Sequence, residues 1–429
     1  MRIKVMAASL ATVLLMSSLA ACNTSNEEGP KDSSSPTATS SESALSAPES
    51  GAKLLVWDTQ GNELDYLKKV GADFEKRYGV PVKVAPVPNI DTVGKLVTDG
   101  PAGIGADVFS APHDHVGKAV TAGLVLENDR TRDDIEKNDV PAALPALSYE
   151  EVLYGYPIAV DTYALYYNKK LLKEAPKTYE ELIAFAKTYN DPKSKKFAFV
   201  WDVPQIYLAY SFLSGYGGYI FGKDGTDPND IGLNNEGAVE GAKFLQSLKE
   251  ILPLNAEDVN NTVVTGLFQE GKSAAMIYGP GQMESLRSTD IDFGVAPLPM
   301  LPGGKQPRSL LSIRGLFVNS YTKYPIAAKM FAEFASNADN LKTRFEMTGQ
   351  IPPQKDFVND PALEANPGVK AFLEQAIHAD PLPSIPEAGT LWVPSFAALS
   401  SIWSKGEDPK KALDRMVEQM KTAMKTNNQ

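Results

Sequence analysis

Cysteine and histidine are scarce in this chain of 429 residues, which holds one cysteine, Cys22, and three histidines. A single cysteine cannot form an internal disulfide, and a zinc site built from several thiolates is excluded. Basic residues are also in deficit, 42 against 53 acidic residues, and the formal net charge is -11. This charge argues against nucleic acid or an anionic membrane surface as an electrostatic partner. A neutral ligand remains compatible with the composition.

The N-terminus has the pattern of a secretory signal. Arg2 and Lys4 precede an uncharged, mostly apolar run over residues 5–21, which ends in Leu-Ala-Ala just before Cys22. A basic head, an apolar run and small residues before a cleavage point are typical of such signals, so residues 1–21 are predicted to be removed. The ending resembles the lipobox of bacterial lipoproteins. That resemblance implies a diacylglyceryl group on the Cys22 sulfur, anchoring in the cell membrane and an extracytoplasmic location. A retained membrane span is the alternative.

Residues 22–51 are predicted to be a disordered tether that begins at the lipidated cysteine. From residue 23 to residue 50 the chain is rich in Ser, Thr, Pro and Glu and has almost nothing large and apolar. Such a segment cannot bury enough apolar surface to fold. The rest of the chain is long enough for two or three compact domains.

Alternation of strands and helices indicates an α/β fold after the tether. Strands are expected over residues 53–58, 80–85 and 106–110, and a helix over residues 63–78. This order favours a mainly parallel sheet. In such sheets ligands lie beyond the carboxyl ends of the strands, so the loops after the first and third strands are candidate ligand contacts.

Residues 155–169 form an apolar and aromatic run that predicts a buried strand, with Asp161 in its middle. A carboxylate in such a run needs a partner or a cavity, because an isolated buried charge costs several kcal/mol. One interpretation is that the chain crosses here between two lobes and that Asp161 faces the cleft between them. A structural aspartate at a bend near Pro157 is the alternative.

Further elements follow downstream. Thr178 and Glu181 have the spacing of a capping box at a helix start, and the aromatic-rich segment from residue 197 to residue 221 comes next. Further helices are expected over residues 236–252 and 263–270, strands over 273–278, 293–299 and 310–319, and a final amphipathic helix over 408–424.

Five groups of residues resemble, in the same order, the ABC-importer solute-binding proteins of the maltose/maltodextrin-binding family. They are Ala-Asp-Val-Phe at 106–109 before Pro-His-Asp at 112–114; Tyr-Pro-Ile-Ala-Val-Asp at 156–161 before Tyr-Asn-Lys at 167–169; Gly-Gly-Tyr-Ile-Phe at 217–221; Phe-Gln-Glu-Gly-Lys-Ser-Ala-Ala-Met at 268–276 before Gly-Pro at 279–280; and Pro-Ser-Ile-Pro at 383–386 before Trp392.

The resemblance implies a two-lobed periplasmic-binding-protein-like α/β fold with hinge crossovers and a ligand cleft between the lobes. The first lobe would comprise residues 52–160 plus 311–361, and the second residues 161–310 plus 362–429. It further implies a monomer that binds a maltose or maltodextrin-type oligosaccharide without a cofactor or metal. The loaded protein would deliver its sugar to the permease subunits of an ABC importer and would not be an enzyme.

The resemblance also assigns ligand-binding residues. Sugars offer hydroxyl pairs to carboxylates and flat C–H patches to aromatic rings. Asp114 and Asp161 match acidic positions of the family, and Tyr207 and Trp392 match its stacking positions; packing in the core is the alternative for both aromatics. Further candidates for sugar contacts are His115, Asn62, Gln205, Tyr210 and Arg314.

The chain departs from the family pattern at several positions. Ala111 and Gly281 stand where the family has tryptophans, so two stacking platforms are missing, and His115 stands where the family often has arginine. These departures leave open a different ligand, such as a cyclic or branched glucan. Two other function classes also stay open: a glycoside hydrolase using Asp114 and Asp161, and a metal-binding receptor using His113, Asp114 and His115.

Overall fold

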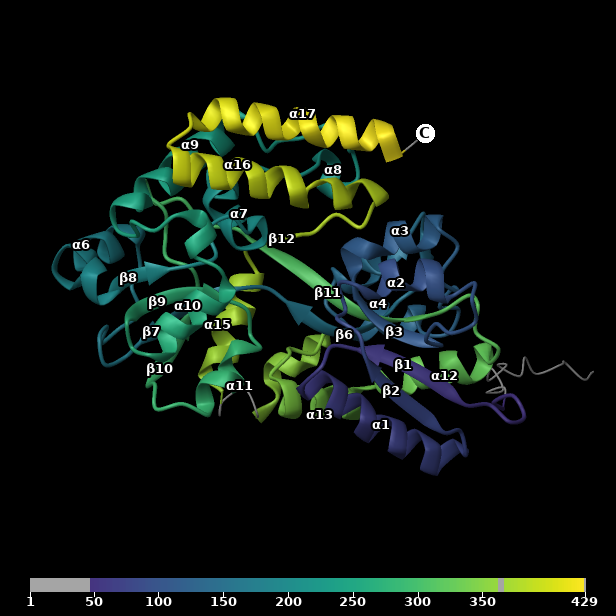
Figure 1. The fold of residues 1–429 in the computed structure, drawn as a ribbon. Coiled ribbons are helices and arrows are strands. Elements are labelled where there is room, and N and C mark those ends of the chain that lie inside the picture. Colours follow the sequence, from purple (N-terminus) through teal and green to yellow (C-terminus); the bar gives the residue numbers. More distant parts are fainter. Residues whose placement is uncertain (1–46, 362–365, 428–429) are drawn as a thin grey trace, which may run out of the picture. The chain divides into compact units, whose positions relative to one another are not determined.

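The polypeptide is organised around two β-sheets with helices packed against them (Figure 1). The structure is a computed structural model that describes residues 47–361 and 366–427. The predicted signal at residues 1–21, the lipidated Cys22 and nearly all of the tether lie outside the described residues. Within the described ranges, no helix combines the length and the apolar character needed to cross a membrane.

The larger sheet has six strands, in the order β12-β11-β3-β1-β2, with β6 on β11. Neighbours β2, β1 and β3 are parallel, as the sequence predicts, whereas β11 runs antiparallel to both β3 and β6. The strands are β1 (Leu54–Asp58), β2 (Val82–Pro86), β3 (Val108–Pro112), β6 (Tyr156–Asp161), β11 (Ser309–Val318) and β12 (Ala379–Pro381).

The smaller sheet has four strands in the order β10-β7-β9-β8. Its central strand β7 is antiparallel to both neighbours, and only β8 and β9 are parallel. The strands are β7 (Ala164–Asn168), β8 (Phe197–Val200), β9 (Ser273–Tyr278) and β10 (Phe293–Ala296). A separate hairpin pairs β4 (Ser148–Tyr149) with β5 (Val152–Leu153).

The single strand expected over residues 155–169 is in fact two strands in different sheets. β6 ends at Asp161 in the larger sheet, and β7 begins at Ala164 in the smaller one. At the crossing, the Thr162 hydroxyl donates to the Leu310 carbonyl oxygen at 3.0 Å and lies 2.8 Å from the Ser309 hydroxyl, so the link is tied to β11. Both strands are buried on both faces, and an apolar run of this kind does not reveal where one sheet gives way to the next.

Helices cover both sheets. The helices that pack around the larger sheet, on its strands or on neighbouring elements, are α1 (Asn62–Tyr78), α2 (Thr92–Asp99), α3 (Val116–Thr121), α4 (Arg132–Asn138), α5 (Ala143–Ala146), α12 (Pro325–Ala335) and α13 (Ala338–Thr348). The remaining helices are α6 (Tyr179–Tyr189), α7 (Ile206–Ser214), α8 (Gly222–Gly225), α9 (Glu236–Ser247), α10 (Asn261–Gln269), α11 (Gln282–Arg287), α15 (Pro367–Ala376), α16 (Trp392–Lys405) and α17 (Pro409–Asn427). Of these, α7 and α15 also contact β11 of the larger sheet. In Figure 1, α16 and α17 lie side by side, in agreement with their contacts.

Local signals place the helix ends. α1 ends at Gly79, which adopts a left-handed conformation with φ 69°, and its N–H bonds the Glu75 carbonyl oxygen. The predicted capping box forms only in part at α6. The Glu181 N–H donates to the Thr178 hydroxyl at 3.3 Å, but the Glu181 carboxylate accepts from Lys177 instead of Thr178.

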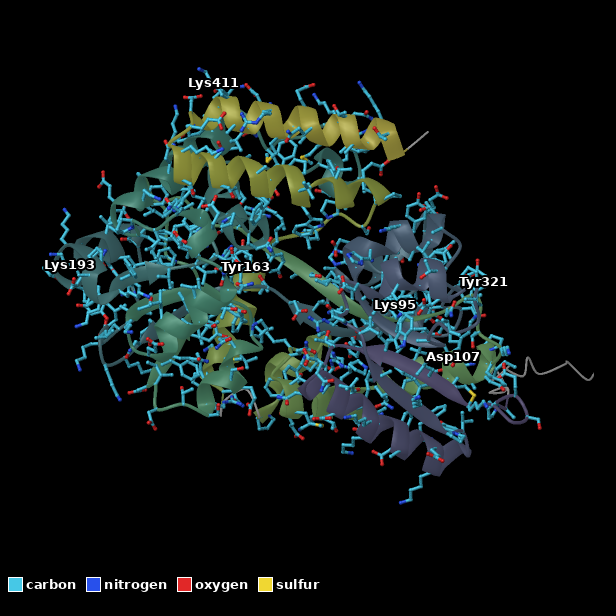
Figure 2. All side chains as sticks on the ribbon, in the orientation of Figure 1. Lys95, Asp107, Tyr163, Lys193, Tyr321 and Lys411 are labelled. Carbon is cyan, nitrogen blue, oxygen red and sulfur yellow. The ribbon has the colours of Figure 1, made fainter. Side chains whose placement is uncertain are left out.

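The core around the smaller sheet is rich in aromatic side chains. Trp201 and Trp403 are buried and meet edge to face, with ring centroids 5.3 Å apart. Tyr163, at the crossing between the sheets, lies in the interior, whereas Lys193 and Lys411 extend from the surface (Figure 2). The chain thus has the two-lobed α/β fold expected from the sequence.

Candidate ligand-binding site

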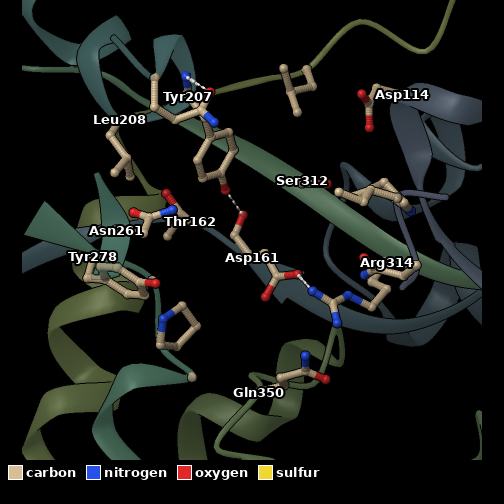
Figure 3. Close-up of a pocket in the computed structure, with 18 of the residues that line it drawn as sticks. Asp114, Asp161, Thr162, Tyr207, Leu208, Asn261, Tyr278, Ser312, Arg314 and Gln350 are labelled. Atoms are coloured by element: carbon tan, nitrogen blue, oxygen red, sulfur yellow. Dashed lines mark hydrogen bonds and ion pairs between the residues drawn. The ribbon is translucent and has the colours of Figure 1, made fainter. Parts of the chain in front are cut away.

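A cavity of about 830 Å³ lies where the two sheets approach each other, lined by residues from both (Figure 3). Its volume falls in the upper part of the range of small-molecule sites, roughly 300–1,000 Å³. The residues that line it are Glu63, Asn89, Ile90, Pro112, Asp114, His115, Asp161, Thr162, Gln205, Tyr207, Leu208, Asn261, Tyr278, Gly279, Pro280, Gly281, Gln282, Ser312, Arg314, Gln350, Leu382, Trp392, Val393 and Phe396.

Asp161 lines this cavity from the carboxyl end of β6. Its Oδ2 accepts a hydrogen bond from the Arg314 guanidinium at 2.9 Å, and its main-chain oxygen accepts from the Tyr207 hydroxyl at 3.2 Å. Both bonds appear as dashed lines in Figure 3. The carboxylate that interrupts the apolar run therefore has the partner that its burial requires.

Arg314 lies on β11 between two carboxylates. Its guanidinium contacts Asp161 on one side and is 3.6 Å from Glu63 Oε1 on the other. Burial alone would lower the pKa of Arg314, but the charges of Asp161, Asp58 and Glu63 outweigh burial and raise it. The guanidinium therefore stays charged, and it orients two acidic groups at the wall of the cavity.

A network continues from Glu63 through Gln350, which also lines the cavity, into the core. Gln350 donates to Glu63 Oε1 at 3.3 Å and accepts from Arg344 Nε at 2.8 Å. Arg344 and Asp58 are both fully buried, with 3.5 Å between the guanidinium and the carboxylate. The Arg344 guanidinium also lies 5.0 Å from the centre of the Tyr66 ring, a cation–π distance. The acidic wall of the cavity is thus held by charges in the core behind it.

Four aromatic residues line the cavity from the other lobe: Tyr207, Tyr278, Trp392 and Phe396. Tyr207, on α7, packs edge to face on Tyr163 with a centroid distance of 5.3 Å. Burial and the neighbouring charge of Asp161 raise the pKa of Tyr207 well above its usual value, so its phenol stays a neutral donor. Trp392, the first residue of α16, is partly buried, unlike the core residue Trp403.

The segment after β3 turns into a short 3₁₀ helix, His113–His115, which brings Asp114 and His115 to the cavity. His113 points elsewhere. Its Nδ1 accepts from the Ile313 N–H at 2.9 Å and its Nε2 donates to the Leu382 carbonyl oxygen at 2.7 Å. Burial lowers the pKa of His113, so the neutral ring joins two segments of main chain.

These bonds leave His113 without a free nitrogen for a metal ion. Among the described residues, no group of three or more His, Cys, Asp or Glu side chains is arranged to hold one. The interpretation of residues 113–115 as a metal site therefore finds no support in the geometry.

Three polar groups at the cavity are almost inaccessible to water and have no hydrogen-bond partner among the described residues. They are His115 Nδ1, Gln282 Nε2 and Arg314 Nε. Buried polar groups are nearly always bonded, and an unbonded one costs roughly 1–3 kcal/mol. Of the eleven such atoms among the described residues, these three lie at the cavity, where a ligand that carries hydrogen-bonding groups would satisfy them.

The structure brings together most of the residues singled out from the sequence. Asp114, Asp161, Tyr207 and Trp392 line the cavity, and so do His115, Gln205 and Arg314.

Asn62 and Tyr210 do not line the cavity. The Tyr210 hydroxyl donates to Asp380 at 2.8 Å and the side chain is buried. Asn62 is exposed at the start of α1, and the next residue, Glu63, lines the cavity in its place.

Sequence reasoning missed Glu63, Gln282, Gln350 and Phe396 at this site. Glu63 follows the loop after the first parallel strand, where ligand contacts are expected, so its position could have identified it. Gln350 and Gln282 carry no comparable signal. Gln350 follows the glycine that ends α13, and Gln282 follows the turn at residues 279–281. Phe396 is one helical turn beyond Trp392, a spacing that would equally suit a core residue.

Residues 69–371 match the family of bacterial extracellular solute-binding proteins. The chain is 38% identical over 421 residues to a galactooligosaccharide-binding protein of Bacillus subtilis (strain 168), covering 96% of this chain and 95% of that protein. It is 29% identical over 424 residues to a maltooligosaccharide ABC transporter solute-binding lipoprotein of Streptococcus pneumoniae serotype 4, covering 97% and 96%.

A solved structure of a cyclo/maltodextrin-binding protein complexed with maltotetraose is similar in fold and sequence. The TM-score is 0.78 and the identity 38%, over 87% of this chain and 97% of that one. The matched family, the relatives and the shared two-lobed architecture agree. The chain belongs to the bacterial extracellular solute-binding proteins.

Proposed function

We propose that this protein captures a neutral oligosaccharide of the maltose/maltodextrin type in the cavity between its lobes and delivers it to an ABC importer. The observation that carries the proposal is the division of the cavity wall. Acidic and basic groups held in fixed positions line one side, and the aromatic residues Tyr207 and Trp392 line the other.

This division suits a sugar. Carboxylate oxygens accept hydrogen bonds from hydroxyl groups, and the guanidinium and amide N–H groups that lack partners donate to hydroxyl oxygens. Aromatic faces cover the C–H surface that a sugar ring exposes on each side. A ligand without hydroxyl groups would leave these polar groups of the cavity without hydrogen-bond partners.

The relatives support the same class of ligand and partner. One is named a maltooligosaccharide ABC transporter solute-binding lipoprotein, and one similar structure is a complex with maltotetraose. These names are consistent with a protein that binds and releases a sugar without cleaving it. The hydrolase alternative would need two carboxylates placed on either side of a glycosidic bond, but Asp161 is engaged by Arg314. Release of reducing ends from maltotetraose by the purified protein would revive that alternative.

A galactooligosaccharide is a second candidate ligand. It is favoured by the relative from Bacillus subtilis, which is 38% identical and carries that name. Both candidates are neutral chains of hexose units and would use the same polar and aromatic groups. They differ in linkage and in the orientation of single hydroxyl groups, which a built site discriminates through its hydrogen bonds.

Isothermal titration calorimetry with glucose, maltotetraose and a galactooligosaccharide of similar length tests the proposal. The protein should be kept in a detergent without a sugar headgroup, since maltoside detergents would compete. We expect binding of an oligosaccharide and weak or no binding of glucose, because one unit cannot reach both sides of a cavity of this size. Absence of heat and of thermal stabilisation with both oligosaccharides would refute the proposal.

The tether and anchor belong to the same proposal. The only cysteine, Cys22, follows Leu-Ala-Ala, and one relative is named a lipoprotein. A lipidated Cys22 would hold a monomer at the outer face of the cell membrane, with residues 1–21 removed. Mass spectrometry of the mature N-terminus checks this, and an unmodified Met1 or Cys22 would contradict it.

We also propose the lobe boundaries given by the family resemblance, residues 52–160 plus 311–361 and residues 161–310 plus 362–429. The change of sheet between β6 and β7 supports the division at residue 161. One strand of residues 362–429 belongs to the larger sheet, because β12 pairs with β11 there.

A further inference from the structure

The mouth of the cavity carries apolar side chains that are left in water. Among the described residues, eight large hydrophobic side chains are exposed, and three of them line this cavity: Ile90 at 64%, Val393 at 80% and Phe396 at 51%. Single exposed hydrophobic residues are common and need no explanation. A group of them beside a concave site marks a contact surface, because each would gain by leaving water.

Two of these residues share one helix face with Trp392. Positions three and four apart are neighbours on a helix, so Val393 and Phe396 adjoin each other, and Phe396 adjoins Trp392. Four residues advance the helix by about 6 Å, so Phe396 extends the aromatic surface by one turn beyond Trp392. Ile90 comes from the other lobe, in the segment between β2 and α2.

The exposure of Phe396 does not come from a loosely held helix. Further along α16, Ile402 and Trp403 are buried in the core, and the Trp403 Nε1 donates to the Leu254 carbonyl oxygen at 2.7 Å. α16 also packs against α17, α7 and α9. Phe396 is therefore presented to the cavity mouth by a rigid element, before any ligand arrives.

The cavity is open at Gly281, where the family resemblance places a tryptophan. Gly281 lines the cavity with an ordinary helical backbone, and a Cβ added there would meet no atom within 4 Å. Ala111, the other position where a stacking tryptophan is missing, is buried and does not line the cavity. α16 therefore supplies two of the four aromatic residues that line this cavity, Trp392 and Phe396, and the other two are Tyr207 on α7 and Tyr278 on β9.

We propose that Phe396, with Val393 and Ile90, covers the C–H face of an additional sugar unit beyond those held at Trp392 and Tyr207, and so selects longer oligosaccharides over disaccharides. The inference rests on the proposed function and deepens it by naming a determinant of ligand length. A disaccharide seated against the polar wall would leave Phe396 in water, and only a longer chain would cover it.

Calorimetry with Phe396→Ala in the full-length protein tests the inference, with maltose and maltotetraose as one ligand pair and galactooligosaccharides of two and four units as the other. For whichever pair the unaltered protein binds, the variant should bind the four-unit sugar roughly tenfold more weakly, about 1.4 kcal/mol. Its affinity for the two-unit sugar should stay within about twofold. Phe396→Tyr, which keeps the ring, should restore the preference for the longer sugar.

Ile377→Ala is the matched control, because Ile377 is 77% exposed and lies outside the cavity. It should change neither affinity. An equal loss of affinity for both lengths, or no loss for either, would overturn the inference while leaving the proposed function in place. So would unchanged sugar binding with impaired uptake by cells, which would reassign the apolar surface to the membrane partner. If the unaltered protein bound no sugar of either pair, both proposals would fall.

Discussion

The two walls of the cavity are prepared for a ligand in opposite ways. On the wall formed by the larger sheet and α1, Asp161, Arg314 and Glu63 hold one another in place and are backed by a buried ion pair. On the wall formed by α16, Val393 and Phe396 have no cover and remain in water. The contrast separates two tasks. Under the proposed function, fixed polar groups would set which hydroxyl arrangement is accepted, whereas open apolar surface would add affinity in proportion to the ligand that covers it.

Removing the support behind the polar wall should have the largest effect. Arg344→Leu leaves the Asp58 carboxylate buried without its cation, and we expect the free energy of unfolding to fall by about 3–5 kcal/mol. Denaturant titration measures the loss. Adding Asp58→Asn to the variant removes the unpaired charge and should recover part of the stability. A single variant within about 0.5 kcal/mol of the unaltered protein would show that this pair does not support the wall.

A second buried carboxylate, Asp139, sharpens the comparison, because no ion pair is found for it among the described residues. Burial, with a smaller contribution from Asp134, raises the pKa of Asp139 to about 7. The unfolded chain has an ordinary pKa near 4, so the native state binds this proton more tightly. The associated stability is present below about pH 4 and is lost as the pH rises to about 7.

Asp139→Asn should therefore match the unaltered protein at pH 4 and exceed it at pH 8. The gain should be no more than about 4 kcal/mol, taking about 1.4 kcal/mol for each unit of pKa. Melting curves at the two pH values measure it. A variant that is equally destabilised at both values would indicate that the carboxylate serves as a bonded structural group.

The aromatic wall should show a smaller effect that is confined to binding. Trp392→Ala is expected to weaken oligosaccharide binding by roughly 2 kcal/mol, the scale of an aromatic hot spot. The melting temperature without ligand should change little, because the side chain is only partly buried. Calorimetric affinity that stays unchanged in a folded variant would remove Trp392 from the site. Phe396→Ala should affect only the longer sugars.

Much of this arrangement could be predicted before the structure, and Asp161 shows why. An isolated carboxylate in an apolar run signals a cavity or a partner wherever the run is placed, and the structure provides both. The single strand expected around it was wrong, because both halves of the run are equally buried. Tyr210 was a reasonable candidate beside Tyr207, but Asp380, 170 residues away in the chain, accepts its hydroxyl.

The amino-acid sequence by itself determined the α/β alternation, the family and the acidic and aromatic residues of the cleft, because periodicity and ordered local motifs are properties of neighbouring residues. Only the tertiary structure decided which polar groups meet. Gln350 bonds Arg344 nearby and Glu63 across 287 positions of chain. Phe396 lines the cavity because the packing of α16 directs it there. Contacts of this kind depend on how distant elements pack, which no local pattern records.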